Sequence, residues 1–270
     1  MGCQEGCLLT GRNIVSTIVA LSGGKASAWC ANWALENYPK ESVILYFNDT
    51  KWEHPDLYRF LSDLEIYFDH KITRDNDGRS PEELFYDRSG LANNRMPFCS
   101  ATLKALRLQR FYKNGDTIIF GIGVSEAHRA LRLINVYNGI SEKTGKSVKL
   151  IFPLIDNAVT SEQVNDFLIQ AKIEEPMLYK LGFTHNNCSG GCVRAGKKQW
   201  KLLYDKLPDI YFDRERVERE VREWLGKDIH FFKDETLEEF RGRIERGELS
   251  SYYDENDTET ECIGICSTMA

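Results

Sequence analysis

Short apolar runs alternate with stretches of helical spacing as far as Val159. Five runs have the length and composition of buried strands: residues 14–21, 42–47, 66–73, 117–120 and 146–154. Apolar positions at helical spacing predict helices between them: over 26–35, from Pro55 onward, and over 100–113. Strands that alternate with helices predict an α/β fold, in which a mostly parallel sheet is covered by helices on both faces.

The pattern becomes helical from Thr160 onward, where Thr160 and Gln163 have the spacing of a capping box. Further helices are predicted over 213–225 and 234–246, ended by Gly226 and Gly247. The polar, acidic stretch that follows predicts a flexible linker. We therefore expect four parts: an N-terminal tail (1–12), an α/β domain (13–159), a helical region with a cysteine loop (160–249) and a flexible, acidic, cysteine-containing tail (250–270).

Composition adds mild limits. The chain has 270 residues, 42% of them hydrophobic and 28% charged, which is typical of a globular protein. Because no apolar run approaches a membrane span or a signal peptide, we expect a cytoplasmic protein without a membrane partner. In that compartment, eight cysteines favour metal binding or catalysis over disulfides. A net charge of −6 gives no general attraction to nucleic acid; the basic segment 194–206 is expected to be a solvated helix face, although it leaves a tRNA or DNA substrate open.

The segment Ser22-Gly23-Gly24-Lys25-Ala26-Ser27, here called the 22–27 loop, joins the first predicted strand to the first helix. Its glycine pair allows a sharp turn and a close approach to a ligand. The first amides of the helix then point at the turn, where an anion satisfies them. Ser22 and Ser27 add hydroxyls and Lys25 adds a cation, so the sequence predicts a phosphate or sulfate site. Two further loops, 48–53 and 121–129, also follow strand ends, where ligands of such sheets lie.

The 22–27 loop resembles the PP-loop, S-G-G-x-[DT]-S, of the superfamily of ATP pyrophosphatases and phosphoadenosine phosphosulfate (PAPS) reductases, the adenine nucleotide α-hydrolases. Ala26 departs from that pattern, since the family has Asp or Thr there. The resemblance implies a Rossmann-like (HUP-type) sheet and makes residues 13–159 a PP-loop nucleotide-binding domain. It also implies that ATP or a PAPS-like nucleotide binds with Mg²⁺.

Three more segments resemble the family. Residues 47–53 are similar to F-N-T-G-x-E with Asp49 as an extra residue, which implies that Asn48 contacts the nucleotide; the carboxylate of Asp49 or Glu53 would grip the ribose or Mg²⁺, or else cap the helix at Pro55. Residues 95–104 are similar to R-x-C-T-x-x-L-K. There Ser100 at a helix start, Lys104 one turn on and Arg95 would bind an anion.

Residues 121–129 resemble G-I-R-x-D-E-x-x-R. Gly121, Glu126 and Arg129 match this pattern, whereas the family's first arginine is replaced by Gly123 or Val124. His128 is expected to be a solvated neighbour. The resemblance thus implies catalytic roles for Lys25, Lys104 and Arg129, and nucleotide contacts from Ser22, Gly23, Gly24, Lys25, Ser27, Asn48, Arg95, Ser100, Gly121 and Glu126.

The cysteines form a second group. Cys188 and Cys192 lie in a glycine-rich turn, residues 185–196, here called the cysteine loop, and the same spacing recurs at Cys262 and Cys266. The likeness to iron–sulfur members of the family implies a 4Fe-4S cluster on Cys99, Cys188 and Cys192, with Cys266 or Cys262 as a fourth ligand. Two alternatives stay open: zinc, which would accept the same thiolates, and buried cysteines that bind no metal. The residues 261–264 weakly resemble the E-C-G-x-H tail of PAPS reductases, and Cys30 is expected to be buried and inert.

Three functions follow from the resemblance. In the first, ATP adenylates a substrate at the α-phosphorus with loss of pyrophosphate, and a cluster-borne sulfide or another nucleophile displaces AMP. In the second, a PAPS or adenylyl-sulfate reductase releases sulfite with a thiol reductant. In the third, suggested by Ala26 and the missing arginine, the chain binds nucleotide without catalysis. The acceptor, whether tRNA, DNA base or metabolite, and a sulfur donor protein or thiol reductant as partner are left open.

Overall fold

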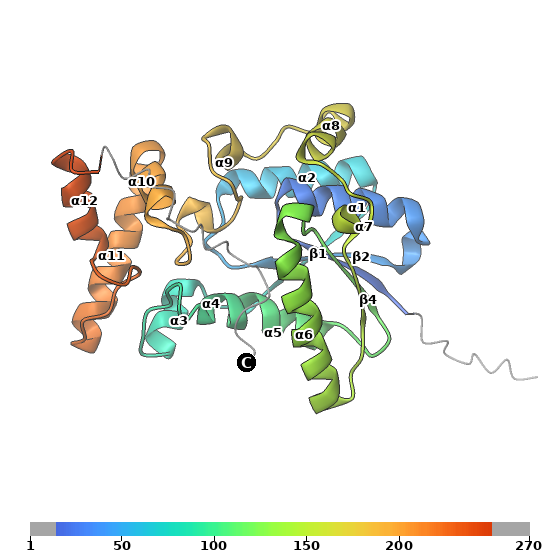
Figure 1. Cartoon of the computed structure of the whole chain (residues 1–270), viewed down its shortest axis with the longest axis horizontal. Coiled ribbons are helices and arrows are strands. Elements are labelled where there is room, and N and C mark those ends of the chain that lie inside the picture. Colours follow the sequence, from blue (N-terminus) through green and yellow to red (C-terminus); the bar gives the residue numbers. More distant parts are fainter. Residues whose placement is uncertain (1–14, 250–270) are drawn as a thin grey trace, which may run out of the picture.

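Five parallel strands form one sheet, in the order β3-β2-β1-β4-β5; Figure 1 labels β1, β2 and β4. The computed structural model describes residues 15–249. The strands are β1 (Thr17–Leu21), β2 (Val43–Asp49), β3 (Ile72–Asn76), β4 (Thr117–Phe120) and β5 (Lys149–Ile151). Val19 of the central strand β1 pairs with Leu45 on one side and with Ile119 on the other. This topology confirms the predicted α/β fold.

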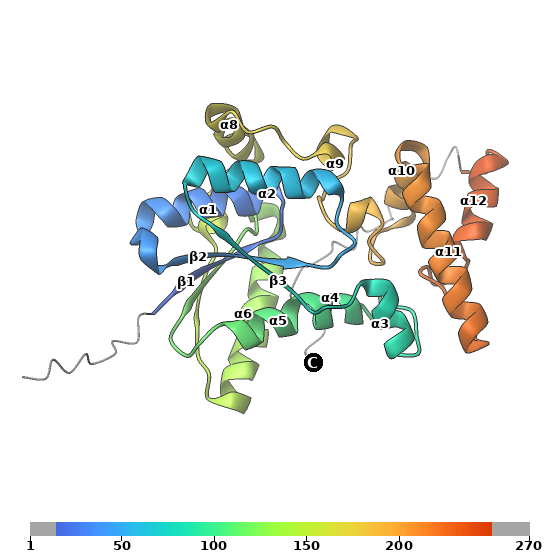
Figure 2. The ribbon, with the colours of Figure 1, turned by 180° about the vertical axis from the view of Figure 1, so that it is seen from behind.

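Helices cover both faces of the sheet (Figure 2). One face packs against α1 (Lys25–Asn37), α2 (Pro55–Phe68), α7 (Pro153–Asp156) and α8 (Ser161–Ala171). The other face packs against α5 (Leu106–Phe111) and α6 (Ala127–Thr144). Residues of one strand contribute to both cores, since Ile18 belongs to the second and Val19 to the first. A strand that is buried on both faces explains why the apolar runs are continuous rather than alternating.

The C-terminal helices form a third core beyond the carboxyl ends of the strands. They are α10 (Lys197–Lys206), α11 (Pro208–Leu225) and α12 (Leu237–Glu245). Trp200 and Phe240 of these helices belong to one apolar cluster with Trp52, which follows β2, and with Phe85 of α3 (Pro81–Asp87). Helices at the C-terminal end were predicted, and the structure confirms them.

The prediction of a strand over 66–73 was wrong. Helix α2 continues to Phe68, and β3 begins only at Ile72. Ile66 is apolar but 79% exposed, because it lies on the solvent side of α2. Asp69 ends this helix in a left-handed conformation, with φ of 45°, a role more commonly taken by glycine.

Other boundaries also shift. The strand predicted over 146–154 shortens to β5, because Pro153 begins α7. The helix predicted from Ser100 starts two residues earlier and runs through α4 (Phe98–Ser100), the wide π-helical turn η2 (Ala101–Ala105) and α5. Helix α11 begins at Pro208 rather than 213, and α12 begins at Leu237 behind a Thr236 capping box. The capping box at Thr160 is confirmed. The predicted tails, with Cys262 and Cys266, lie outside the described residues.

Candidate functional site

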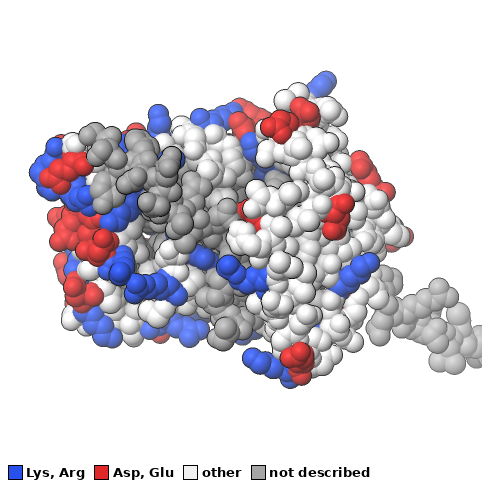
Figure 3. Space-filling model, in the orientation of Figure 1, with Lys and Arg blue, Asp and Glu red and all other residues white. Residues whose placement is uncertain are grey.

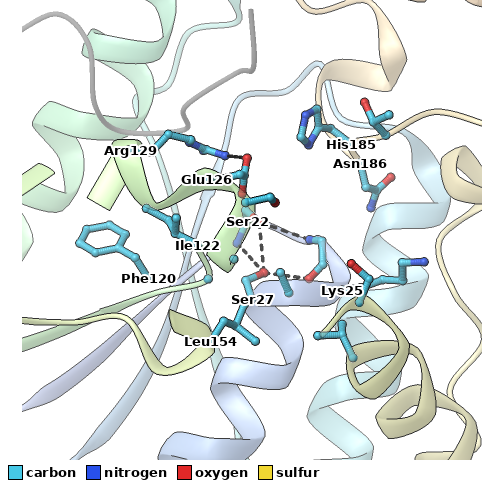
Figure 4. A pocket seen from close by; sticks show the side chains of 18 of the residues that line it. Ser22, Lys25, Ser27, Phe120, Ile122, Glu126, Arg129, Leu154, His185 and Asn186 are labelled. Atoms are coloured by element: carbon cyan, nitrogen blue, oxygen red, sulfur yellow. Dashed lines mark hydrogen bonds and ion pairs between the residues drawn. The ribbon is translucent and has the colours of Figure 1, made fainter. Parts of the chain in front are cut away.

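A cleft of about 600 Å³ opens at the carboxyl ends of β1 and β4 (Figure 4). Its walls are the 22–27 loop, the segment 120–129 and the segment 184–187. The structure brings eight predicted site residues to this cleft: Ser22, Gly24, Lys25, Ser27, Lys104, Gly121, Glu126 and Arg129. Phe120, Ile122 and Leu154 gather on one side as an apolar wall.

The 22–27 loop is held in shape by its own hydroxyls. The Ser27 Oγ donates to the Gly24 carbonyl at 2.9 Å and lies 3.1 Å from the Ser22 Oγ. Gly23 has φ of +80°, a conformation that side chains rarely adopt. Gly24 is the N-cap of α1 and has no side chain to accept from the first amides of the helix; the Lys25 amide instead donates to the Tyr179 hydroxyl.

Gly121 brings the end of β4 against the start of α1. A Cβ atom built at this position would lie 2.8 Å from both the backbone N and the Cα of Ser27. Glycine is therefore required by close packing of two backbones, which fixes the 120–129 segment relative to the loop. On the far side of this contact, Glu126 and Arg129 form an ion pair within the cleft. Val124 and His128 are both exposed and line no described cavity.

Helix α9 (Met177–Lys180) and the residues around it cover the loop cation. The Lys25 Nζ lies 2.9 Å from Glu175 Oε2 and 4.5 Å from the centre of the Tyr179 ring. Burial raises the pKa of Tyr179 to about 12, so its hydroxyl stays protonated beside Gly24. The Asn186 Nδ2 donates to the Gly23 carbonyl at 2.8 Å.

His185 faces the loop across the cleft (Figure 4). Neither it nor Glu175 and Tyr179 were predicted from the sequence. Nothing in the composition of residues 172–180 marks Glu175 or Tyr179. His185 and Asn186 do adjoin the cysteine motif, and that proximity is the one signal that pointed toward them.

Lys104 stands between the cleft and the cysteines. Its Nζ lies 3.4 Å from Glu53 Oε1, and the Glu53 side chain is only 1% exposed. The same carboxylate accepts a hydrogen bond from Thr50 Oγ1 at 2.8 Å and one from the Cys188 amide at 2.7 Å. Neither Asp49 nor Glu53 caps α2, because His54 occupies the N-cap and its Nδ1 accepts from the Asp56 amide.

A second, much smaller cavity of about 20 Å³ is lined by Cys99, Cys188 and Cys192, together with Ser100 and Lys104. The three predicted ligands thus meet in space although they are far apart in sequence. A cavity of this size holds about one water molecule. Among residues 15–249 no group of three or more His, Cys, Asp or Glu side chains could hold a metal ion. The three thiols therefore have the right chemistry for a soft metal but not, as they stand, the arrangement.

The remaining predicted residues lie elsewhere. Asn48 is buried and donates to the Tyr46 hydroxyl at 3.2 Å, and Arg95 is exposed; both lie outside the two cavities. Gly23 supports the loop from behind, where a Cβ atom would lie 2.7 Å from Leu57. Cys30 is buried as predicted, and this burial raises the pKa of its thiol.

The basic segment 194–206 is solvated only in part, since Lys198 and Lys206 are exposed as expected. Arg194 is buried, and Lys197 is paired with Asp234 and Glu235. The face in Figure 3 shows Lys and Arg side chains in a band between the C-terminal helices and the sheet domain. No helix among residues 15–249 is both long and apolar enough to cross a membrane.

Comparisons with known proteins give one family. The sequence profile of the phosphoadenosine phosphosulfate reductase domain matches residues 16–194, well over half of the chain. No curated protein matches the chain. Among solved structures, PAPS reductase from Candida auris in its phosphate complex is 17% identical, with a TM-score of 0.44, over 67% of this chain and 83% of that one. The U34-tRNA thiolase NcsA from Methanococcus maripaludis, with its 4Fe-4S cluster, is 16% identical, with a TM-score of 0.41, over 84% of this chain and 78% of that one.

Proposed function

Since the chain belongs to the phosphoadenosine phosphosulfate reductase domain family, within the adenine nucleotide α-hydrolases, we propose that it activates a substrate with ATP and then transfers sulfur to it. In the first step a substrate oxygen attacks the α-phosphorus, which forms an adenylated substrate and releases pyrophosphate. In the second step hydrosulfide from a sulfur donor, held at the cysteine loop, forms a bond to the carbon that carries the adenylated oxygen; the carbon–oxygen bond breaks and AMP leaves with that oxygen.

The observation that carries this proposal is the position of Lys104, which lines both the cleft and the cysteine cavity. A nucleotide whose phosphates contact Lys104 has its reacting end beside Cys99 and Cys188. Because Lys104 lines both cavities, the proposed sites of activation and of sulfur transfer would be separated by about the length of one side chain.

The described residues suggest how the nucleotide would be held. The 22–27 loop and the N-terminus of α1 bind phosphate oxygens, and Lys25 adds its charge once it leaves Glu175. The apolar wall of Phe120, Ile122 and Leu154 offers a surface for the adenine ring. Catalysis consists mainly of positioning and of stabilising charge on the α-phosphate by Lys104 and Arg129.

Most ligands of Mg²⁺ at this site would come from the phosphates of the nucleotide and from water. Glu126 is the one carboxylate among the described residues that line the cleft, and it is paired with Arg129. Mg²⁺ usually keeps several waters and bridges substrate phosphates with only one or two protein carboxylates. Glu126 is therefore the protein ligand that we propose.

A 4Fe-4S cluster or zinc on Cys99, Cys188 and Cys192 stays a prediction of the sequence. Soft thiolate donors suit both. Among residues 15–249 these thiols form no group that could hold a metal ion. Iron, zinc and acid-labile sulfide measured in anaerobically purified protein decide this question, and a colourless zinc-loaded protein would eliminate the cluster.

The second candidate is reduction of a sulfonucleotide to sulfite, which the family match itself favours. One pair of assays separates the two. ATP with Mg²⁺ should yield pyrophosphate under the first proposal, whereas PAPS or adenylyl sulfate with a thiol reductant should yield sulfite under the second. Lys104→Met should abolish whichever product forms. Nucleotide binding with neither product would refute both reactions and leave a binding module.

A further inference from the structure

We propose that Glu53 is a positioning residue that links the nucleotide cleft to the cysteine loop by competing with nucleotide for Lys104. This inference rests on the proposed function in one respect, namely that a nucleotide occupies the cleft. The family motifs assign Glu53 no such role; at the sequence level it was a ribose or Mg²⁺ ligand, or a helix cap.

The Glu53 carboxylate is buried, and three groups satisfy it. Its Oε1 faces the Lys104 Nζ at 3.4 Å and accepts from Thr50 Oγ1 at 2.8 Å, while its Oε2 accepts from the Cys188 amide at 2.7 Å. A carboxylate that is 1% exposed has no access to bulk water and depends on these partners. Lys104 supplies the opposite charge, whereas the other two groups are neutral donors.

Cys188 is placed by this contact. Cys188 and Ser189 both have left-handed backbone angles, with φ of 49° and 54°, in the short turn η4 (Cys188–Gly190). Such angles are uncommon outside glycine and persist where surrounding contacts impose them. Two hydrogen bonds hold this turn. The Cys188 amide donates to Glu53, and the Ser189 hydroxyl donates to the Trp52 carbonyl at 2.9 Å. Both partners lie in the segment that follows β2, so this segment sets the position of the cysteine loop.

Lys104 therefore has two anionic partners, Glu53 and a phosphate in the cleft. When the phosphate attracts Lys104, Glu53 depends more strongly on its remaining donors, including the Cys188 amide. Nucleotide binding is thereby coupled, through the Glu53 carboxylate, to the strength of the hydrogen bond that holds the Cys188 amide. Lys104 has two arrangements, one paired with Glu53 and one paired with the phosphate. A nucleotide shifts the equilibrium between them because it interacts more strongly with the second.

Glu53→Gln removes the competing charge while it keeps the size of the side chain. We expect calorimetry to show that the variant binds ATP about threefold or more tightly than the wild-type protein. We expect hydrogen exchange with mass spectrometry to show faster exchange of the Cys188 amide. The matched control is Glu65→Gln. The Glu65 carboxylate also accepts two hydrogen bonds, one from the Ile72 amide at 2.9 Å and one from the Arg74 guanidinium at 3.3 Å. It does not line the cleft. The control should change neither value.

Tighter nucleotide binding together with a looser loop is a result that a merely structural role would not produce, because general destabilisation weakens both. Unchanged or weaker ATP binding by a folded Glu53→Gln protein overturns the inference. If this variant does not fold, the wild-type protein decides: saturating ATP should slow exchange of the Cys188 amide, and unchanged or faster exchange overturns the inference. Failure of the wild-type protein to bind ATP, PAPS or adenylyl sulfate would instead refute the proposed function.

Discussion

The charge of Lys25 is already paired within the protein. Its ammonium forms an ion pair with Glu175, which precedes α9, and lies over the ring of Tyr179. Under the proposed function, a nucleotide phosphate must displace the Glu175 carboxylate before it pairs with Lys25. At the scale of single residues, this contact lowers nucleotide affinity and favours ligands that carry several negative charges.

Glu175→Gln should consequently raise the affinity for ATP, by up to about fivefold, since a partly exposed ion pair is worth about 0.2–1 kcal/mol. The neighbouring Glu174→Gln is the control, because Glu174 pairs with Lys180 rather than with Lys25. Isothermal calorimetry on the two variants measures the difference. Equal affinities would show that Glu175 does not compete with the nucleotide.

Gly121 and Gly123 offer a second matched pair in one loop. Gly121→Ala places a methyl 2.8 Å from the Ser27 backbone, whereas a Cβ at Gly123 meets no atom within 4 Å. We expect Gly121→Ala to cost about 1–3 kcal/mol of unfolding free energy through overpacking, and to weaken nucleotide binding, because the 22–27 loop must shift. Gly123→Ala should change neither. Urea unfolding and calorimetry provide the two measurements, and a harmless Gly121→Ala would contradict the close packing described above.

At the scale of elements, α11 holds the connection to α12 through one buried carboxylate. Glu218 accepts from the Phe231 amide at 2.7 Å and from the Leu237 amide at 2.6 Å. Burial raises the pKa of Glu218 to about 7, although both amides, His230 and Arg222 act in the opposite direction. The carboxyl group thus holds a proton in the folded protein at pH values where the unfolded chain has lost it.

This difference predicts that stability falls as pH rises. Between about pH 4.3, the pKa of an unfolded Glu, and about pH 7, the folded protein binds more protons, so that the free energy of unfolding decreases by up to about 4 kcal/mol. Glu218→Gln should remove this slope, whatever its effect on stability at a single pH. Glu220→Gln, in the exposed ion pair with Arg216, should keep it. Urea titrations at pH 5 and 7.5 compare the slopes, and an unchanged slope in Glu218→Gln would assign the pH dependence to other groups.

The sequence was sufficient for the layout of the elements because buried parallel strands have continuous apolar runs. It misplaced β3 because Ile66 and Tyr67 look like strand residues, while α2 ends at an aspartate in the left-handed conformation. Motifs likewise identified the 22–27 loop, Gly121 and Lys104, each at the end of a strand or on a recognisable helix. Glu175 and Tyr179 could not be found, because they reach the loop from 150 residues away by tertiary packing and carry no local signal.

At the scale of the whole molecule, the family match and the folding unit differ in extent. The match ends at residue 194, yet Trp52 and Phe85, which lie within it, are buried against Trp200 and Phe240, which do not. Arg214 of α11 also stacks on Trp52, 3.6 Å from the ring centre. The cysteine loop is thus supported from outside the part that the family shares.

A chain that stops at residue 194 should therefore fail to fold cooperatively. It would expose the apolar residues of the third core and leave the segment after β2 without its main support. Circular dichroism during thermal unfolding compares it with the full chain, for which one steep transition is expected. A truncated chain with an equally steep transition at the same temperature would show that the helical end is dispensable.

The π-helical turn at Ala101–Ala105 has an evolutionary consequence. Such a turn is equivalent to one residue inserted into an ordinary helix. A lineage that deleted this residue would regain regular hydrogen bonding, but one end of the helix would rotate by about 100° against the other. Cys99 and Lys104 would then no longer line the same cavity. Selection for a more stable helix and selection for chemistry oppose each other here, so the irregular turn should be inherited with the function and lost when the function is lost.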